Sequence, residues 1–492
     1  MDNLKRREFI KNTVLAGIGT SMAVPVISGD REKSHVNTET YPDKSSGFNK
    51  KKVIVAGAGI AGLCCGYELM KRGHEVIVLE ASGRHGGHVY TGRDGLSDGL
   101  YADLGAEHYT KPGYDLIFGY AKEFDLTVLP YPRRINMLRR IDGKFYSEEM
   151  LHDPIVLKKF GFNDREIKYL SENPWWDLQS LFLKPYFHKF KDEYQPFGIG
   201  YDHLDNIPVS DIYKKEGASQ TALGFLGGKN NSALFELWRG AIMNIRGIPL
   251  SSQDTFRLKG GNQGLPDAFA KRLGKRVKLN CPIQSIKHTE KDVSVTYKEF
   301  GEEKVITADF LANCIPLPAF KNIPIHPALP PEKQYVIDNV TYGSYPHFVF
   351  QASSEFWLDD GFKSINMILD HPDIDSIWRV ADEVDTFRVV LLATGPGGVS
   401  AQRALAGFRE VYPGKHDTIE QALVKDWSKE QYSFTCERLP FPMGELKRFW
   451  PEVMLPHRRI YFAGAYADNL NRGQEAATRS AYRVAKDIND HA

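Results

Sequence analysis

Three glycines between residues 57 and 62, with an acidic residue at position 80, could hold a ligand that contains phosphate. Gly57, Gly59 and Gly62 follow the apolar run 53–56 and open a helix-like segment. The first glycine allows a sharp turn, the second lets a pyrophosphate approach the backbone, and the third lets helix and strand pack closely. Glu80 ends a second apolar run, where a carboxylate can accept hydrogen bonds from an adenosine ribose. This order predicts a dinucleotide site in one βαβ unit, with contacts from Gly57, Gly59, Ile60, Ala61, Gly62, Glu80 and Ala81.

A second segment suited to phosphate follows the acidic residue. Arg84 precedes the adjacent Gly86 and Gly87, so a cation and a close-approaching backbone occur together. The acid at position 80 argues against NADP, because a ribose phosphate would favour arginine there. These residues alone leave NAD and FAD open. Near the C-terminus, another apolar strand, residues 459–463, runs into Gly464.

Together these blocks resemble the flavin amine oxidase family, which includes monoamine, polyamine and L-amino-acid oxidases. The resemblance extends from about residue 51 to the end and is carried by residues 53–80, 84–87, 256–261, 308–316 and 461–464. It implies that the cofactor is FAD. Beyond the first block it implies cofactor contacts from Arg84, Gly86, Gly87, His88, Gly105, Ala106, Glu107, Ile283, Gly464 and Ala465.

The chain departs from the family pattern at four places. His88 stands where the second motif normally closes with arginine, and Ala465 replaces the usual acid after the C-terminal strand. His347 stands ten residues before Trp357, where the family commonly has a lysine that holds a water at flavin N5. Residues 473–474 are Gly and Gln, where amine oxidases often place an aromatic residue of a cage around the substrate nitrogen.

His347 and His108 are the candidate catalytic residues. The family alignment places His347 beside the flavin, where a neutral imidazole could accept a proton or hold a water. The alternative is a strand histidine satisfied by a neighbouring carbonyl. His108 follows Glu107 and could reach the same cavity or cap a strand, while Glu107 could bond the flavin or fix a turn. Arg84 is expected at the pyrophosphate, because a guanidinium suits phosphate geometry.

Three functions are compatible with these residues. The first is oxidation of a C–N bond in an amine or amino acid by hydride transfer to flavin N5, which requires the neutral amine. The second is oxidation or desaturation at C–C or C–OH on the same scaffold. The third is flavin binding without turnover. Oxygen or a periplasmic redox carrier would accept the electrons. The chain could also form a homodimer.

The elements that must position these residues point to an α/β fold. We expect a Rossmann-like FAD-binding domain built from discontinuous segments, and an α+β substrate domain with an antiparallel sheet. Residues 348–350 and 387–393 are the expected strands of that sheet, and residues 400–412 the helix that follows. The expected segments are a signal (1–30), a linker (31–50), FAD-binding parts (51–130, 255–320, 430–492), a helical substrate part (131–254) and a second substrate part (321–429).

Aromatic residues are concentrated between residues 175 and 197. A hydrophobic core is the default explanation for such side chains, and the wall of a substrate pocket or entry channel is the alternative. The cluster comprises Trp175, Trp176, Phe182, Tyr186, Phe187, Phe190, Tyr194 and Phe197.

Charge and composition exclude several classes of protein. The chain has 492 residues, long enough for two domains, with 63 basic and 62 acidic residues. No basic face for nucleic acid is indicated. The histidines are scattered and no CxxC or HExxH motif occurs, so no metal site is predicted.

The N-terminus resembles a twin-arginine export signal. Arg6 and Arg7 lie in a basic segment that precedes the moderately apolar stretch 13–26. That stretch is too short and too rich in glycine for a stable membrane span. We therefore expect a periplasmic or exported enzyme that acquires FAD before transport.

Five cysteines imply no disulfide framework. Cys436 lies in a segment, residues 432–436, that is similar to the one where monoamine oxidases attach FAD through a thioether. An ordinary buried thiol, or one beside the flavin, is the other interpretation.

Overall fold

The computed structural model describes residues 49–249, 252, 254–435, 437–470 and 473–491. Its first sheet is parallel and five-stranded, in the order β10-β2-β1-β14-β23. Alternate side chains of β1 enter different hydrophobic clusters, so both faces of this sheet are buried. This explains the continuous apolar runs of the sequence. The strands are β10 (Val277–Lys278), β2 (Glu75–Leu79), β1 (Lys52–Ala56), β14 (Phe310–Asn313) and β23 (Ile460–Phe462).

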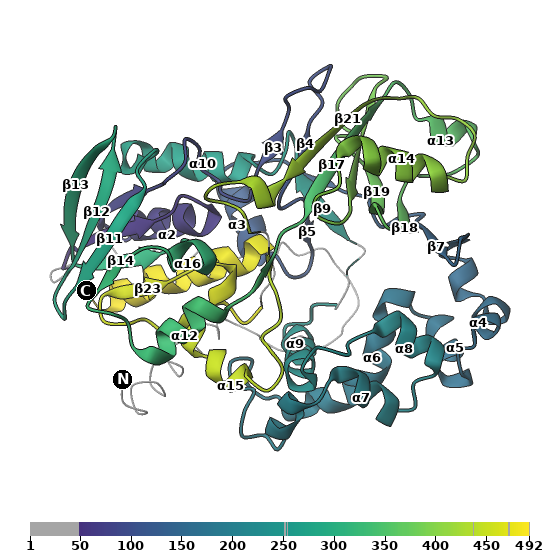
Figure 1. Cartoon of the computed structure of the whole chain (residues 1–492), viewed down its shortest axis with the longest axis horizontal. Helices are drawn as coiled ribbons and strands as arrows, with labels where there is room; N and C mark the ends of the chain where they lie inside the picture. Colours follow the sequence, from purple (N-terminus) through teal and green to yellow (C-terminus); the bar gives the residue numbers. More distant parts are fainter. Residues whose placement is uncertain (1–48, 250–251, 253, 436, 471–472, 492) are drawn as a thin grey trace, which may run out of the picture.

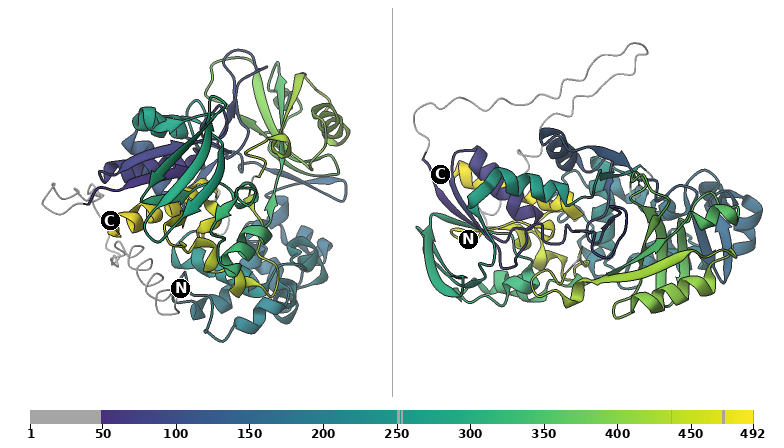
Figure 2. Two further views of the ribbon diagram at one scale, coloured as in Figure 1. Left: turned by 60° about the vertical axis from the view of Figure 1, so that its left-hand side comes forward. Right: turned by 90° about the horizontal axis from the view of Figure 1, so that it is seen from above.

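Helices and a second sheet cover the two faces. On one face, α2 (Ile60–Lys71) packs against α10 (Gly264–Leu273) and α16 (Gly473–Asp490). On the other face lies a four-stranded sheet in the order β13-β12-β11-β15 (Figures 1 and 2). The expected Rossmann-like arrangement is thus present. The second sheet comprises β13 (Glu302–Ala308), β12 (Val293–Glu299), β11 (Ile283–His288) and β15 (Ile325–His326).

A seven-stranded sheet forms the other half of the molecule, in the order β21-β17-β20-β19-β18-β7-β8. Adjacent strands in this sheet run antiparallel, except for the pair β18 and β7, which is parallel. The predicted antiparallel sheet is confirmed, and the predicted helix is α14 (Ala401–Val411), capped by Ser400. The strands are β21 (Ile419–Asp426), β17 (Pro346–Ala352), β20 (Val389–Thr394), β19 (Ile374–Val380), β18 (Met367–His371), β7 (Leu138–Ile141) and β8 (Lys144–Ser147).

Helices dominate residues 154–245, below the seven-stranded sheet in Figure 1. Four members of the predicted aromatic cluster, Phe182, Phe187, Phe190 and Tyr194, are core residues here. Trp175 and Trp176 are only half-buried. The β7–β8 hairpin shows that the segment 131–254 is not purely helical. The helices are α4 (Pro154–Phe160), α5 (Asp164–Leu170), α6 (Leu178–Leu183), α7 (Val209–Lys215), α8 (Gln220–Leu226) and α9 (Ala233–Ile245).

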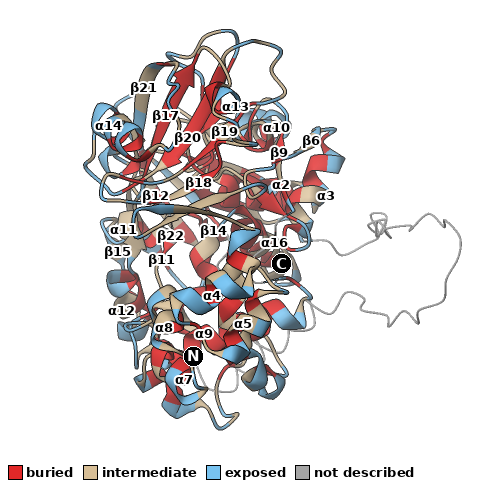
Figure 3. Cartoon of the chain, turned by 90° about the vertical axis from the view of Figure 1, so that its right-hand side faces the viewer, coloured by how far each residue is buried: buried red, intermediate tan, exposed pale blue. Residues whose placement is uncertain are grey.

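Shorter elements join these parts. The strand β9 (Thr255–Leu258), in a block that resembles a family motif, pairs antiparallel with β5 and β6 rather than joining the five-stranded sheet. Figure 3 shows buried residues in the central strands and exposed ones on the outer helical surfaces. The remaining elements are β3 (Thr91–Gly92), β4 (Ala102–Asp103), β5 (Tyr109–Thr110), β6 (Val128–Pro130), β16 (Tyr342–Gly343), β22 (Glu437–Arg438), α3 (Asp115–Glu123), α11 (Leu317–Phe320), α12 (Pro331–Asn339), α13 (Phe356–Asp359) and α15 (Leu446–Phe449).

The predicted signal, residues 1–30, and Cys436 lie outside the described residues. Within the part of the chain that is described, no helix combines the length and apolarity needed to cross a bilayer.

Candidate active site

The glycine turn between β1 and α2 adopts the geometry that the sequence predicts. Gly57 has φ +94°, in the region that favours glycine, and its N–H donates to the Leu79 carbonyl at 2.8 Å. A Cβ added to Gly62 would lie 1.9 Å from the Gly57 carbonyl oxygen, so only glycine fits there. A Cβ added to Gly59 would meet nothing closer than the Gly87 Cα at 4.0 Å. The backbone at Gly59, which caps α2, is therefore open to a ligand.

The second glycine pair lies directly against the first turn. The Gly86 N–H donates to the Ala58 carbonyl at 2.8 Å, and Gly59 and Gly86 form an isolated parallel bridge. A Cβ on Gly87 would approach the Gly59 Cα to 3.1 Å. Two glycine-rich segments thus meet at the N-terminus of α2, while Ile60 and Ala61 are buried in its first turn.

Glu80 is buried and already holds protein groups. One carboxylate oxygen accepts the Ala58 N–H at 2.7 Å and the other accepts the Ser82 N–H at 2.9 Å. A carboxylate has further lone pairs, so a ribose hydroxyl can still be accommodated. The Cys281 N–H donates to the Glu80 carbonyl at 2.7 Å, which brings the chain that leads to Ile283 alongside this end of the site.

A cleft of about 410 Å³ opens beside Ala81, the residue after Glu80. Its wall includes the segment Glu430–Ser433, which the sequence indicated only as the neighbourhood of Cys436. The Nη1 atom of Arg84, another lining residue, is buried and has no hydrogen-bond partner. The remaining lining residues are Ala81, Ser82, Gly83 and Asn280.

Arg84 also belongs to a group of cations around Trp427, which is fully buried. Its guanidinium carbon lies 5.7 Å from the Trp427 ring centroid, and the Lys425 Nζ lies 4.9 Å from it. The His88 ring is 4.2 Å away. Lys425 is the register partner of His347 across β21 and β17, so this group adjoins the predicted catalytic strand.

His88 contacts the segment that holds two other predicted cofactor residues. The Ala106 N–H donates to the His88 carbonyl at 3.3 Å, and a Cβ on Gly105 would lie 1.7 Å from that oxygen. Burial and the nearby His347 lower the pKa of His88 to about 3. The imidazole is therefore neutral at physiological pH, and its Nε2 is buried without a partner.

His347 is buried in β17 and its Nδ1 has no hydrogen-bond partner. Burial and the nearby Arg133 lower its pKa to about 4. The Nδ1 atom of His347 is therefore not hydrogen-bonded to a neighbouring carbonyl. The ring is neutral and offers an acceptor or a donor, according to its tautomer.

Arg133 links the other predicted residues and was not identified from the sequence. It pairs with Glu107, and its Nη1 lies 3.2 Å from the His108 Nδ1. Its guanidinium carbon lies 4.0 Å from the Trp378 ring centroid. Glu107 is thus engaged by a cation, and His108 belongs to the same cluster as His347 through Arg133. No pattern around residues 131–134 could have indicated this, because the partners come from separate elements.

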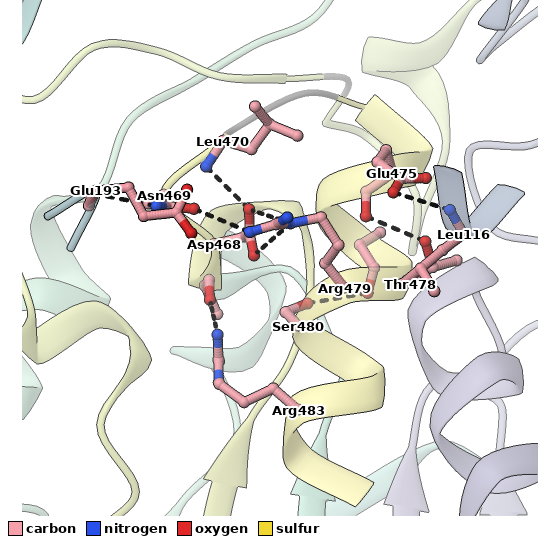
Figure 4. A network of polar contacts seen from close by, with 12 residues as sticks. Leu116, Glu193, Asp468, Asn469, Leu470, Glu475, Thr478, Arg479, Ser480 and Arg483 are labelled. Carbon is pink, nitrogen blue, oxygen red and sulfur yellow. Dashed lines mark hydrogen bonds and ion pairs between the residues drawn. The ribbon is translucent and has the colours of Figure 1, made fainter. Parts of the chain in front are cut away.

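The C-terminal segment completes the site. Gly464 has φ +149°, and its N–H donates to the Ser480 hydroxyl at 2.8 Å; Ala465 follows in a short 3-10 turn. Figure 4 shows how the start of α16 is fixed, with Arg479 on Asp468 and Glu475 on the α3 backbone. The contacts drawn there join Leu116, Glu193, Asp468, Asn469, Leu470, Glu475, Thr478, Arg479, Ser480 and Arg483.

The residues present fit a flavin dinucleotide. Five buried polar atoms from different segments lack hydrogen-bond partners, as expected around a ligand with a polar edge. Contacts connect their neighbourhoods: Gln263 lies against Gly86, Gln474 donates to the Ala106 carbonyl at 3.5 Å, and His88 adjoins both segments. The five atoms are Arg84 Nη1, His88 Nε2, Gln263 Oε1, His347 Nδ1 and Gln474 Oε1.

Known proteins share this chain's sequence and fold. The L-amino-acid oxidase of Demansia vestigiata is 26% identical over 480 residues, which cover 90% of this chain and 87% of that protein. The L-amino acid oxidase of Cerastes cerastes is 26% identical over 470 residues, with the same coverage. Cyclohexylamine oxidase from Brevibacterium oxydans has the same fold, with a TM-score of 0.71 at 18% identity over 90% of this chain and 99% of that one.

A structure of putrescine oxidase bound to putrescine gives a TM-score of 0.70 at 18% identity, over 89% of this chain and 99% of that one. A family model described as flavin containing amine oxidoreductase matches residues 60–489, most of the chain. The cofactor is FAD and the protein is an oxidoreductase that acts on amines. The chain belongs to the flavin-containing amine oxidoreductase family.

Proposed function

We propose that this enzyme oxidises the C–N bond of a small amine or amino acid by hydride transfer. The observation that carries the proposal is the pair of buried imidazoles, His88 and His347, whose low pKa values keep them neutral. When bound, FAD supplies the two-electron acceptor. Its binding elements meet the imidazoles through Arg84, Trp427 and Lys425.

The protein's part is to present the amine without its proton. An ammonium has no lone pair to assist departure of the hydride, and burial disfavours the charged form. His347 carries an unpartnered Nδ1 beside Arg133, so it can accept a hydrogen bond from the substrate nitrogen or hold a water there. The buried aromatic ring of Trp427 keeps bulk water away from this side.

Oxidation at C–C or C–OH is the second candidate. It is favoured by the buried amide of Gln474, which stands where related oxidases often place an aromatic cage residue. An amide can bind a hydroxyl or carbonyl group of a substrate.

An anaerobic screen of amines, amino acids and amino sugars tests the proposal, with loss of the flavin's yellow absorbance as the signal. Release of ammonia or an amine together with a carbonyl compound would support C–N oxidation. Bleaching only by substrates that lack nitrogen would move the assignment to C–C or C–OH chemistry.

We also propose export through the N-terminal twin-arginine segment, a periplasmic redox carrier as electron acceptor, and a homodimer. The redox carrier is supported by His347, which stands in place of the family's lysine. Stopped-flow mixing of reduced enzyme with air-saturated buffer should show slow reoxidation, and His347→Lys should accelerate it. Rapid reoxidation of the unchanged enzyme would count against a carrier. Fractionation of cells tests export, and light scattering of the purified enzyme tests the homodimer.

A further inference from the structure

Arg139 projects from β7 at the boundary between the seven-stranded sheet and the helical segment. Its guanidinium carbon lies 3.8 Å from the Trp175 ring centroid and 4.8 Å from that of Phe225 in α8. Aromatic rings at these distances orient a guanidinium and leave its N–H groups free to donate. The Arg139 side chain is therefore prearranged rather than loosely solvated.

The Nη1 atom of Arg139 is buried and has no hydrogen-bond partner. Among the described residues, no ion pair involves Arg139, and burial lowers its pKa to about 10 without a carboxylate that opposes the shift. Its neighbour Arg140 pairs with Asp370, and Arg133 pairs with Glu107. A buried cationic donor without a partner is unfavourable unless a ligand completes it.

A second unpartnered donor lies close by. Trp176 packs edge-on against Trp175, with ring centroids 5.2 Å apart, and its Nε1 is also buried without a hydrogen bond. The rings and the two donors together suit a planar anion. A guanidinium binds a carboxylate through two parallel hydrogen bonds.

We propose that Arg139 binds a carboxylate group of the substrate, at the end remote from the nitrogen that is oxidised. Arg139 and His347 lie in one row across the seven-stranded sheet, joined by the register partners Ile368, Ser376 and Thr394, so four strand spacings, about 19 Å, separate their Cα atoms. The substrates favoured are amines that carry a carboxylate on an extended chain. This assignment rests on the proposed amine oxidation, whereas carboxylate binding at Arg139 does not.

Calorimetric titration of the holoenzyme with benzoate tests the binding site directly. Arg139→Gln should weaken benzoate binding about tenfold to a hundredfold, because a charge-assisted pair is lost. Arg140→Gln is the matched control and should leave the affinity unchanged, since that side chain is already paired with Asp370. Equal affinity of the unchanged enzyme and Arg139→Gln, or no heat up to about 10 mM benzoate, would overturn the site.

A kinetic comparison tests the link to substrate. With the unchanged enzyme, an amine with a terminal carboxylate should have a lower KM than its methyl ester. Arg139→Gln should reduce this KM ratio about tenfold. Flavin absorbance and melting temperature verify that the variant is folded. The same KM ratio in both enzymes would overturn the substrate assignment. Absence of any amine turnover with benzoate binding intact would instead refute the proposed reaction alone.

Discussion

The two ends of the cofactor site are built in different ways. At the nucleotide end, Gly57, Gly59 and Gly62 lie within six consecutive residues, and the site is shaped mainly by backbone geometry. At the reaction end, Arg133 and His347 come from segments more than two hundred positions apart. The first end is fixed locally, and the second exists only when the whole molecule has folded.

The difference also concerns electrostatics. At the nucleotide end, the N-terminus of α2 has no side-chain cap and Arg84 Nη1 has no partner, so the helix terminus and Arg84 supply positive charge for a polyanion. At the reaction end, Arg133 is paired with Glu107 and Lys425 with Glu430, and the two imidazoles are neutral. The first region holds charge and the second suppresses it.

The largest expected effect separates folding from cofactor binding at the nucleotide end. Gly62→Ala places a methyl group against the Gly57 carbonyl and should destabilise the protein by about 4 kcal/mol or more. Gly59→Ala meets no such clash, so it should fold but bind FAD more weakly. Chemical unfolding and flavin content measure the two effects. Equal loss of stability in both variants would contradict the distinction.

The next effect concerns the buried pair at the reaction end. Glu107→Gln leaves the Arg133 guanidinium without its counter-charge and should lower the free energy of unfolding by about 3 kcal/mol. The double variant with Arg133→Met should recover part of this loss. Glu123→Gln, at the more exposed pair with Lys71, is the control and should cost less than about 1 kcal/mol. Similar losses for the two single variants would argue against burial as the cause.

The effect that is smallest at any one step is the change of stability with each pH unit. The folded-state pKa values of His88 and His347, about 3 and about 4, lie below the ordinary value of 6.5. Between these limits the unfolded chain binds more protons, so stability should fall as the pH drops below 6.5. His347→Asn should reduce the slope by about 1.4 kcal/mol per pH unit. Urea unfolding at several pH values measures this slope, and an unchanged slope would place the uptake elsewhere.

Much of the nucleotide end could be predicted from the sequence, because strand, turn and helix follow one another directly. The α14 helix and the β17–β20 pair were also recognisable from periodicity. Arg133, Trp427 and the segment Glu430–Ser433 were not, because their partners are remote in sequence. The β7–β8 hairpin has no clear signal in the sequence, because its strands are half-buried and Arg139 and Arg140 break the alternation of apolar and polar residues.

The order of strands in the five-stranded sheet has a consequence for biosynthesis. Its central strand β1 is made early, yet its neighbour β14 starts at Phe310, and β23 at the edge starts at Ile460. During translation, β1 can pair with β2 as soon as Leu79 is made, but its other edge lacks β14 until more than half of the chain has been made. We expect chaperones to guard the nascent polypeptide over this interval, and slow closure of the sheet because its contacts span long stretches of sequence.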